Sequence, residues 1–139
     1  MEKFNSILLI DDDPSSNYIG QQLIDKLDLA STVHCAFNGR HALQLLNDLN
    51  VIPDVIFLDL NMPLMNGYEF LAAFHEKFPA AVHSNIVILT SSEDGRDLDK
   101  VQTYGIRYYL CKPLIEHNLL KICEIIQLNV KLKFVMLAS

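Results

Sequence analysis

The sequence predicts an α/β fold in which helices cover both faces of a parallel sheet, and two observations lead to this prediction. Short apolar runs rich in branched residues alternate with longer amphipathic stretches along the chain. Two of these runs, VIFL within Asp54–Asp59 and IVIL within Asn85–Thr90, are almost continuously apolar. Strands that are covered on both faces have this composition, and strands that alternate with helices build a parallel sheet.

Five strand–helix units follow one another, and right-handed crossovers are expected to connect them. The first predicted helix shows the helical pattern well, because Ile19, Leu23 and Leu27 repeat every four residues. The predicted strands are Ser6–Asp11, Ser31–Ala36, Asp54–Asp59, Asn85–Thr90 and Arg107–Cys111. The predicted helices are Ser15–Leu29, Gly39–Leu49, Gly67–Phe78, Asp94–Tyr104 and Ile115–Leu128.

Composition narrows the classes of function. A chain of 139 residues, half of them apolar, fits one domain with one sizeable core. A formal charge of −6 disfavours direct, non-specific binding of nucleic acid, which needs a basic face. Charged or polar residues interrupt every apolar run, so no membrane span and no secretion signal are predicted, and a cytoplasmic location is expected. The three cysteines lack CxxC spacing and are expected to be buried free thiols.

Polar residues stand at the carboxyl ends of four predicted strands. In an open parallel sheet, ligands bind at this edge. The first strand ends in Asp11 and Asp12, the third in Asp59 and the fourth in Thr90, and the fifth runs into Lys112. The sequence therefore predicts that groups suited to metal and phosphate chemistry meet on one rim of the sheet.

Four segments carrying these residues resemble the receiver domain of two-component response regulators. They are ILLIDDDP, DLNMPLMNG, ILTSS and YYLCKP, and they follow in the order of that family. Asp59 and Thr90 are 31 positions apart, and Thr90 and Lys112 are 22 positions apart. The resemblance covers about residues 5 to 128. It implies a CheY-like, flavodoxin-like sheet of five parallel strands in the order 2-1-3-4-5.

The resemblance implies that Asp59 is the nucleophile that accepts a phosphoryl group, with Mg²⁺ as the cofactor. Asp12 would bind the metal directly, and Asp11 would do so largely through water. Asp59 itself and the backbone carbonyl of Asn61 would complete the protein ligands. Hard oxygen ligands of this kind suit Mg²⁺. Asp13 is excluded from the metal site, because it precedes Pro14 and is better explained as a helix cap.

The resemblance also gives expectations for five further positions. Thr90 would donate its hydroxyl to a phosphoryl oxygen, and Lys112 would place its ammonium against another. The Lys112–Pro113 bond is cis in the family. Tyr109 would be the switch aromatic that follows Thr90, although a plain core aromatic is an equal alternative. Gly67 would supply backbone freedom before the third helix.

Neighbouring positions carry weaker expectations. Tyr108 should point to the opposite face of the sheet from its neighbour. Ser91 is small, which would leave the acceptor accessible to a donor. Asn61 and Ser92 would influence the lifetime of the acyl phosphate, whereas Met62 and Pro63 would only shape the loop.

The implied donor is a phosphohistidine on a sensor histidine kinase or a histidine phosphotransfer protein. The sequence divides into a receiver domain at residues 1–128 and a tail at 129–139, which is too short for a helix-turn-helix. A stand-alone receiver that signals through protein contacts is therefore expected, with the partner unknown. The alternating tail NVKLKFVMLAS fits a strand or a continued helix. It would form a homodimer or dock the output partner, and a terminal helix turn packed on its own domain is an equal alternative.

Two other functions are alternatives to the phosphorylated switch. A receiver-like scaffold that works without phosphorylation is the main alternative, although it predicts the loss of a key residue. A Mg²⁺-dependent phosphohydrolase would need a second acid/base aspartate close to the nucleophile, where this chain has Asn61. The chain is therefore not expected to be an enzyme that turns over external substrates.

Overall fold

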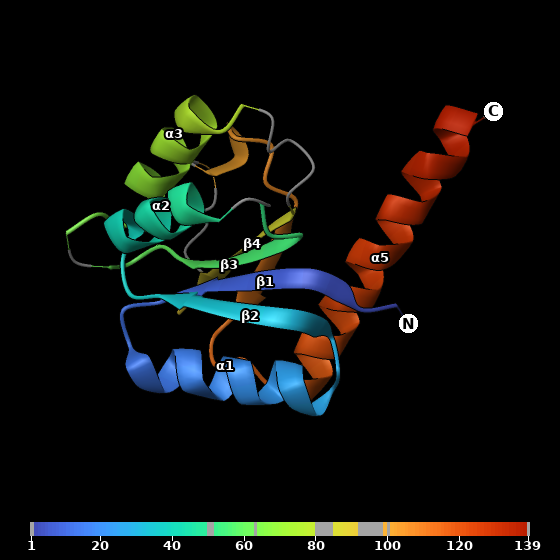
Figure 1. The fold of residues 1–139 in the computed structure, drawn as a ribbon, viewed down its shortest axis with the longest axis horizontal. Helices are drawn as coiled ribbons and strands as arrows, with labels where there is room; N and C mark the ends of the chain where they lie inside the picture. Colours follow the sequence, from blue (N-terminus) through green and yellow to red (C-terminus); the bar gives the residue numbers. More distant parts are fainter. Residues whose placement is uncertain are drawn as a thin grey trace.

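The computed structural model describes residues 2–49, 52–62, 64–79, 85–91, 99 and 101–138, with the backbone alone given for 133–138. These residues form a five-stranded parallel sheet in the order β2-β1-β3-β4-β5 (Figure 1). The strands are β1 (Phe4–Ile10), β2 (Ala30–Ala36), β3 (Val55–Asp59), β4 (Asn85–Thr90) and β5 (Tyr108–Cys111). The predicted sheet and its strand order are confirmed.

Helices cover both faces of the sheet. Figure 1 shows α2 and α3 on one face, and α1 and the first turns of α5 on the other. Their bounds are α1 (Pro14–Lys26), α2 (Gly39–Asp48), α3 (Gly67–Lys77) and α5 (Glu116–Ala138). The predicted helix Asp94–Tyr104 lies largely outside the described residues, although its described positions 99, 101 and 102 are helical.

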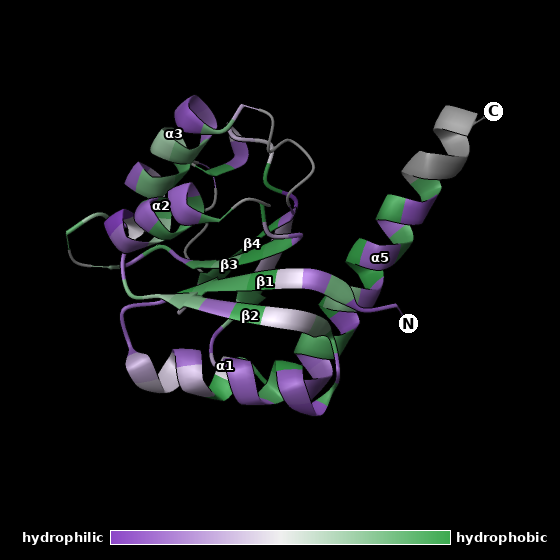
Figure 2. Ribbon diagram, viewed as in Figure 1, coloured by the Kyte–Doolittle hydropathy of each residue, from purple (hydrophilic) through white to green (hydrophobic). Residues whose placement is uncertain are grey.

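The core consists of two apolar clusters, one on each face of the sheet. Side chains alternate between faces along a strand, so β3 contributes Ile56 and Leu58 to the cluster under α2 and α3. Its Val55 and Phe57 enter the cluster under α1 and α5. Every residue of β3 is buried, and Figure 2 colours this strand as hydrophobic. The core thus fixes β3, and with it Asp59, at the centre of the molecule.

Three helices begin at the edge of the sheet where the strands end, and each has a polar cap. Asp13 caps α1 by accepting a hydrogen bond from the Ser15 backbone N–H at 2.9 Å, which confirms the capping role predicted for it. Asn38 caps α2, and Asn66 forms a capping box with Glu69 at the start of α3. These caps fix the loops that surround the candidate site.

The C-terminal segment continues α5 as a helix to Ala138, so of the two conformations left open by the sequence the strand is wrong. The alternation around Lys131 is misleading, because Ile125, Leu128 and Leu132 also repeat at helical spacing. Figure 1 shows the end of this helix projecting beyond the sheet. Among the described helices, including this one, none combines the length and the apolar composition needed to span a bilayer.

Candidate functional site

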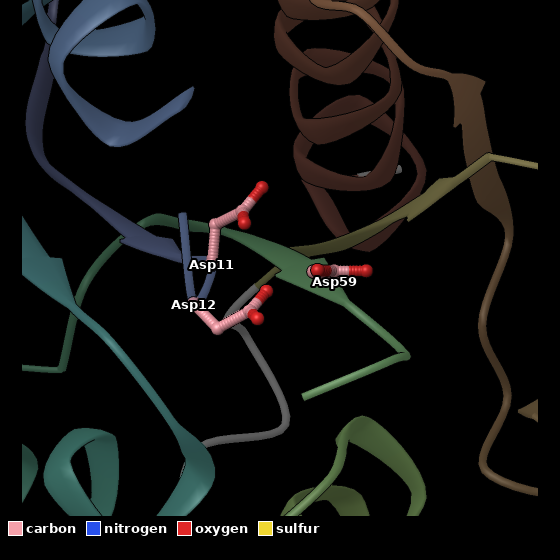
Figure 3. A group of neighbouring side chains, drawn as sticks. All are labelled: Asp11, Asp12 and Asp59. Carbon is pink, nitrogen blue, oxygen red and sulfur yellow. The ribbon is translucent and has the colours of Figure 1, made fainter. Parts of the chain in front are cut away.

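Three carboxylates from two adjacent strands meet at the carboxyl edge of the sheet. The register pairs Ile10 of β1 with Leu58 of β3, so Asp11, Asp12 and Asp59 follow side by side (Figure 3). One carboxylate oxygen from each lies within 4.8 Å of the others. Asp11 and Asp59 are only 3% and 5% exposed, whereas Asp12 is open to solvent. The fold therefore assembles the acidic cluster that the strand ends predict.

Lys112 brings one positive charge into this cluster. Its Nζ lies 2.7 Å from Asp11 Oδ2 and 3.2 Å from Asp59 Oδ2. The backbone N–H of Lys112 donates to the Thr90 carbonyl at 2.8 Å, which continues the β4–β5 pairing beyond Cys111. The Lys112–Pro113 peptide bond is cis, as the family resemblance implies. The lysine thus bridges the two buried carboxylates.

Each buried carboxylate has one oxygen held by a backbone amide. The Asn61 N–H donates to Asp59 Oδ1 at 3.2 Å, and the Asp13 N–H donates to Asp11 Oδ1 at 3.0 Å. Asp11 Oδ2 is buried and receives no well-aligned hydrogen bond from the described part of the chain, so the ion pair with Lys112 is its main contact. A buried carboxylate oxygen of this kind has the capacity to bind a cation.

Burial and charge set the proton affinities of the site. Burial raises the pKa of Asp59, and the neighbouring Asp11 carboxylate adds to the rise, while the Asn61 amide and Lys112 oppose it. Burial lowers the pKa of Lys112, but Asp11 and Asp59 outweigh it and the net pKa is raised. The rise in the pKa of Lys112 therefore comes from its two carboxylate partners, whereas the rise in the pKa of Asp59 comes mainly from burial.

Asp59→Asn is expected to stabilise the protein at neutral pH when divalent cations are chelated. The folded pKa of Asp59 is raised above its ordinary 3.8, so its contribution to stability is present below that value and is lost as pH rises through the folded pKa. The variant should exceed the wild type by about 1 kcal/mol at pH 7. Urea unfolding measured from pH 4 to pH 8 tests this.

The exposed Asp48 on α2 provides the control, since Asp48→Asn removes the same charge outside the cluster. Its effect should stay within about 0.5 kcal/mol. A difference between Asp59→Asn and wild type that does not change with pH would contradict the argument.

Thr90 lies at the end of β4, where the resemblance requires it. Its side chain is buried, and it pairs with Cys111 in the sheet. Asn61 and Ser91 are exposed at the same edge, whereas Met62 is buried beneath the loop. Ser92 and Pro63, which the sequence also singled out, lie outside the described residues.

The two neighbouring tyrosines of β5 face opposite sides of the sheet, as predicted. Tyr108 belongs to the cluster under α1 and α5, and its hydroxyl accepts a hydrogen bond from Asn129 at 2.8 Å. Tyr109 packs on the opposite cluster, and its hydroxyl donates to the Ile106 carbonyl at 3.1 Å. Burial raises the pKa of Tyr109, while a hydrogen bond with Gln102 opposes the rise. The switch role of Tyr109 stays a prediction.

Gly67 is needed for space and not for unusual backbone angles, so the reason expected from the sequence was wrong. It is the first residue of α3, and its N–H donates to the Leu60 carbonyl at 3.0 Å. A Cβ here would lie 2.7 Å from Leu60 Cα and 2.8 Å from the Asp59 carbonyl oxygen. Only glycine lets α3 begin this close to the acceptor strand.

Sequence reasoning missed Asn17, which positions the acidic pair. Asn17 is 3% exposed on the inner face of α1, and its side-chain amide donates to the carbonyls of Asp11 at 3.0 Å and Ala36 at 3.1 Å. It therefore ties the end of β1 to the end of β2. The available signal was its helical spacing with the buried Gly20 and Ile24, where an apolar residue is expected.

Comparison with known proteins agrees with this geometry. The family model described as the response regulator receiver domain matches residues 7–124. The chain is 37% identical over 116 residues to the nitrate/nitrite response regulator NarL of Escherichia coli K12, covering 84% of this chain and 51% of NarL. It is 33% identical over 115 residues to PilG of Pseudomonas aeruginosa, covering 82% and 81% of the two chains.

Solved structures show the same fold. A two-component response regulator from Cytophaga hutchinsonii superimposes with a TM-score of 0.81 at 30% identity, covering 91% of this chain and 98% of that one. The chain spans about half the length of NarL, the first of the curated relatives that it matches. The similarity therefore concerns the domain that these proteins share.

Proposed function

The chain belongs to the response regulator receiver domain family of two-component signalling, and from this premise we propose that it is a switch that accepts a phosphoryl group on Asp59. The observation that supports this most is the position of Lys112, whose ammonium contacts Asp59 and Asp11 together. A lysine between two buried carboxylates neutralises part of their charge and leaves a cationic group beside the acceptor. That arrangement suits an incoming phosphoryl group.

The proposed donor is a phosphohistidine on a sensor kinase or a histidine phosphotransfer protein. One carboxylate oxygen of Asp59 attacks phosphorus, the P–O bond forms, and the P–N bond to the donor imidazole breaks. The imidazole leaves with the bonding electrons and takes up a proton. Transfer of this kind depends on positioning and on charge neutralisation, and both are properties of this site.

The acidic cluster fits Mg²⁺. Asp11, Asp12 and Asp59 offer carboxylate oxygens within 4.8 Å of one another, and Asp11 Oδ2 is buried without a well-aligned hydrogen bond. The backbone carbonyl of Asn61 is the fourth proposed protein ligand. Bound Mg²⁺ supplies positive charge that offsets the carboxylates and the phosphoryl oxygens.

The chain's own residues perform the remaining tasks. Lys112 holds its ammonium against a phosphoryl oxygen as a fixed charge, and Thr90 donates its hydroxyl to another. Tyr109 follows Thr90 and passes the change to the surface of β5. The result is regulated binding of a protein partner and no turnover of an external substrate, since Asn61 stands where a hydrolase would need a second acid.

Incubation with acetyl phosphate, a small-molecule phosphodonor, tests the proposal. The wild-type protein should gain one phosphoryl group in intact-mass spectra when Mg²⁺ is present, and the gain should fall at least about tenfold with a chelator. Peptide mapping should place the group on the peptide containing Asp59. Asp59→Asn should show no gain.

The carboxylate Asp54 serves as a matched control, because it lies at the opposite end of β3 and its replacement with asparagine should leave phosphorylation unchanged. If no adduct forms, binding of beryllofluoride distinguishes a short-lived adduct from an inactive site. Failure of both measurements would overturn the proposal and favour a scaffold that works without phosphorylation.

A further inference from the structure

Helix α5 carries two apolar faces, and only one of them is covered by the domain. The covered face packs on the sheet as part of the cluster shared with α1. Its buried members on α5 are Leu119, Ile122, Cys123 and Ile126. These residues account for the attachment of α5 to the rest of the molecule.

The second face, here called the outer stripe, consists of Ile125, Leu128 and Leu132. Their exposed fractions are 39%, 57% and 52%. The steps of three and four residues match the a and d positions of a coiled coil, so the three side chains line up along one side of the helix. The stripe residues and the buried residues occupy different angular positions around the axis of α5. The stripe therefore lies on the side of the helix away from the buried face.

Contacts with the domain hold the stripe outward. The Gln127 side chain donates to the Glu2 carbonyl at 2.8 Å, and the Asn129 side chain donates to the Tyr108 hydroxyl at 2.8 Å. These bonds fix the rotation of α5 within the length of the outer stripe. The helix therefore cannot turn the stripe toward the sheet without exposing its buried face.

We propose that the outer stripe binds the outer stripe of a second copy of this chain, with the two helices antiparallel. Glu124 and Lys131 are exposed, lie on the same flank of the stripe and are seven residues apart. In an antiparallel pair this flank meets itself, so Glu124 lies beside Lys131 of the partner subunit, and two-fold symmetry repeats the contact. The charges thus complement each other twice.

Parallel pairing lacks this match. The corresponding flank contact would place Glu124 against Asn129 of the partner subunit, which is uncharged and is already bonded to Tyr108 within its own subunit. The chemistry of the stripe and its flank therefore selects an antiparallel copy. This inference does not depend on the proposed chemistry at Asp59, because no residue of the site takes part in it.

Sedimentation equilibrium of the 139-residue chain tests the pairing. The wild type should form a concentration-dependent dimer, and Leu128→Glu should raise the dissociation constant of the dimer at least about 100-fold. Val130→Glu is the matched control, since Val130 is also exposed, at 45%, but lies off the stripe. Its dimer should be unchanged, and circular dichroism should show that both variants keep the fold.

Charge exchange tests the orientation. Glu124→Lys and Lys131→Glu should each weaken the dimer about tenfold, because each variant replaces two ion pairs with two like-charge contacts. The double variant should recover an affinity within about threefold of the wild type. A parallel pair would show no loss in the single variants, and this result would overturn the proposed orientation.

Three outcomes would overturn the pairing itself. They are a wild-type monomer at every concentration, equal effects of Leu128→Glu and Val130→Glu, and a monomer that sediments with vesicles containing anionic lipid. The last outcome would identify a membrane surface as the occupant of the stripe.

Discussion

Lys112→Met is expected to lower the free energy of unfolding by about 3 kcal/mol when divalent cations are chelated. Removal of one partner from a buried ion pair leaves the other charges without compensation. Asp11 and Asp59 would then face each other in the protein interior, with side chains 4% and 7% exposed. Methionine keeps the length and the apolar stem, so the charge is the main change. Urea unfolding at pH 7.5 measures the effect.

Lys26→Met provides the matched control. Lys26 also forms an ion pair, at 2.9 Å to Glu116, but the two side chains are 67% and 48% exposed. Surface pairs contribute little, so this variant should differ from the wild type by at most about 0.5 kcal/mol. Saturating Mg²⁺ should shrink the loss in Lys112→Met, because a bound cation restores positive charge. Equal losses in the two lysine variants would refute the argument.

Asn17→Leu is expected to lower the free energy of unfolding by about 2–3 kcal/mol. Leucine has a similar size, but it cannot donate to the carbonyls of Asp11 and Ala36. The Ala36 carbonyl keeps the Asp11 backbone N–H as a donor at 3.1 Å, so the loss falls mainly on the buried Asp11 carbonyl. A buried acceptor left without a donor costs about 1–3 kcal/mol. The midpoint of urea unfolding, with an unchanged slope, measures the loss.

The exposed Ser15 on the same helix gives the comparison, since Ser15→Ala should have an effect within about 0.5 kcal/mol. Asn17→Leu should also weaken Mg²⁺ binding, because the Asp11 carbonyl loses its side-chain donor and the Asp11 N–H to Ala36 bond alone then ties this end of β1 to β2. A variant with wild-type stability would show that the two carbonyls find other donors.

Sequence patterns were sufficient for the fold because the relevant signals are local. The continuous apolar runs at β3 and β4 follow from burial on both faces, and the structure confirms that burial. Asp11 and Asp59 could be placed together because parallel strands end at the same edge, and the register depends only on which residue ends each strand.

Contacts between distant segments could not be predicted in the same way. The two hydrogen bonds of the Asn17 side chain join α1 to the ends of two strands. Nothing in the local sequence indicates that the acceptors are backbone carbonyls. The sequence indicates that a glycine is needed at position 67, but it does not reveal that lack of space is the cause. The close approach of α3 to Leu60 is a tertiary contact, which local sequence does not encode. The ion pair of Lys112 with Asp11 likewise depends on how far its side chain reaches across β4 to β3 and β1.

The C-terminal segment shows the limit of periodicity. An alternating pattern and a helical pattern overlap between Ile125 and Leu132, and the sequence alone does not separate them. The structure shows a helix here. The first turns of α5 are stabilised by packing on the domain, and adding further turns to an existing helix costs less than starting a new element.

The order of the strands gives the two ends of the Lys112–Asp59 contact different mechanical properties. β3 has a hydrogen-bonded neighbour on each side, whereas the described partner of β5 is β4 alone. A strand bonded along one edge yields to a displacement more easily than one bonded along both. The ion pair therefore connects a strand that is bonded on both sides to one bonded on one side, and we expect a displacement at Asp59 to move β5 more than β3.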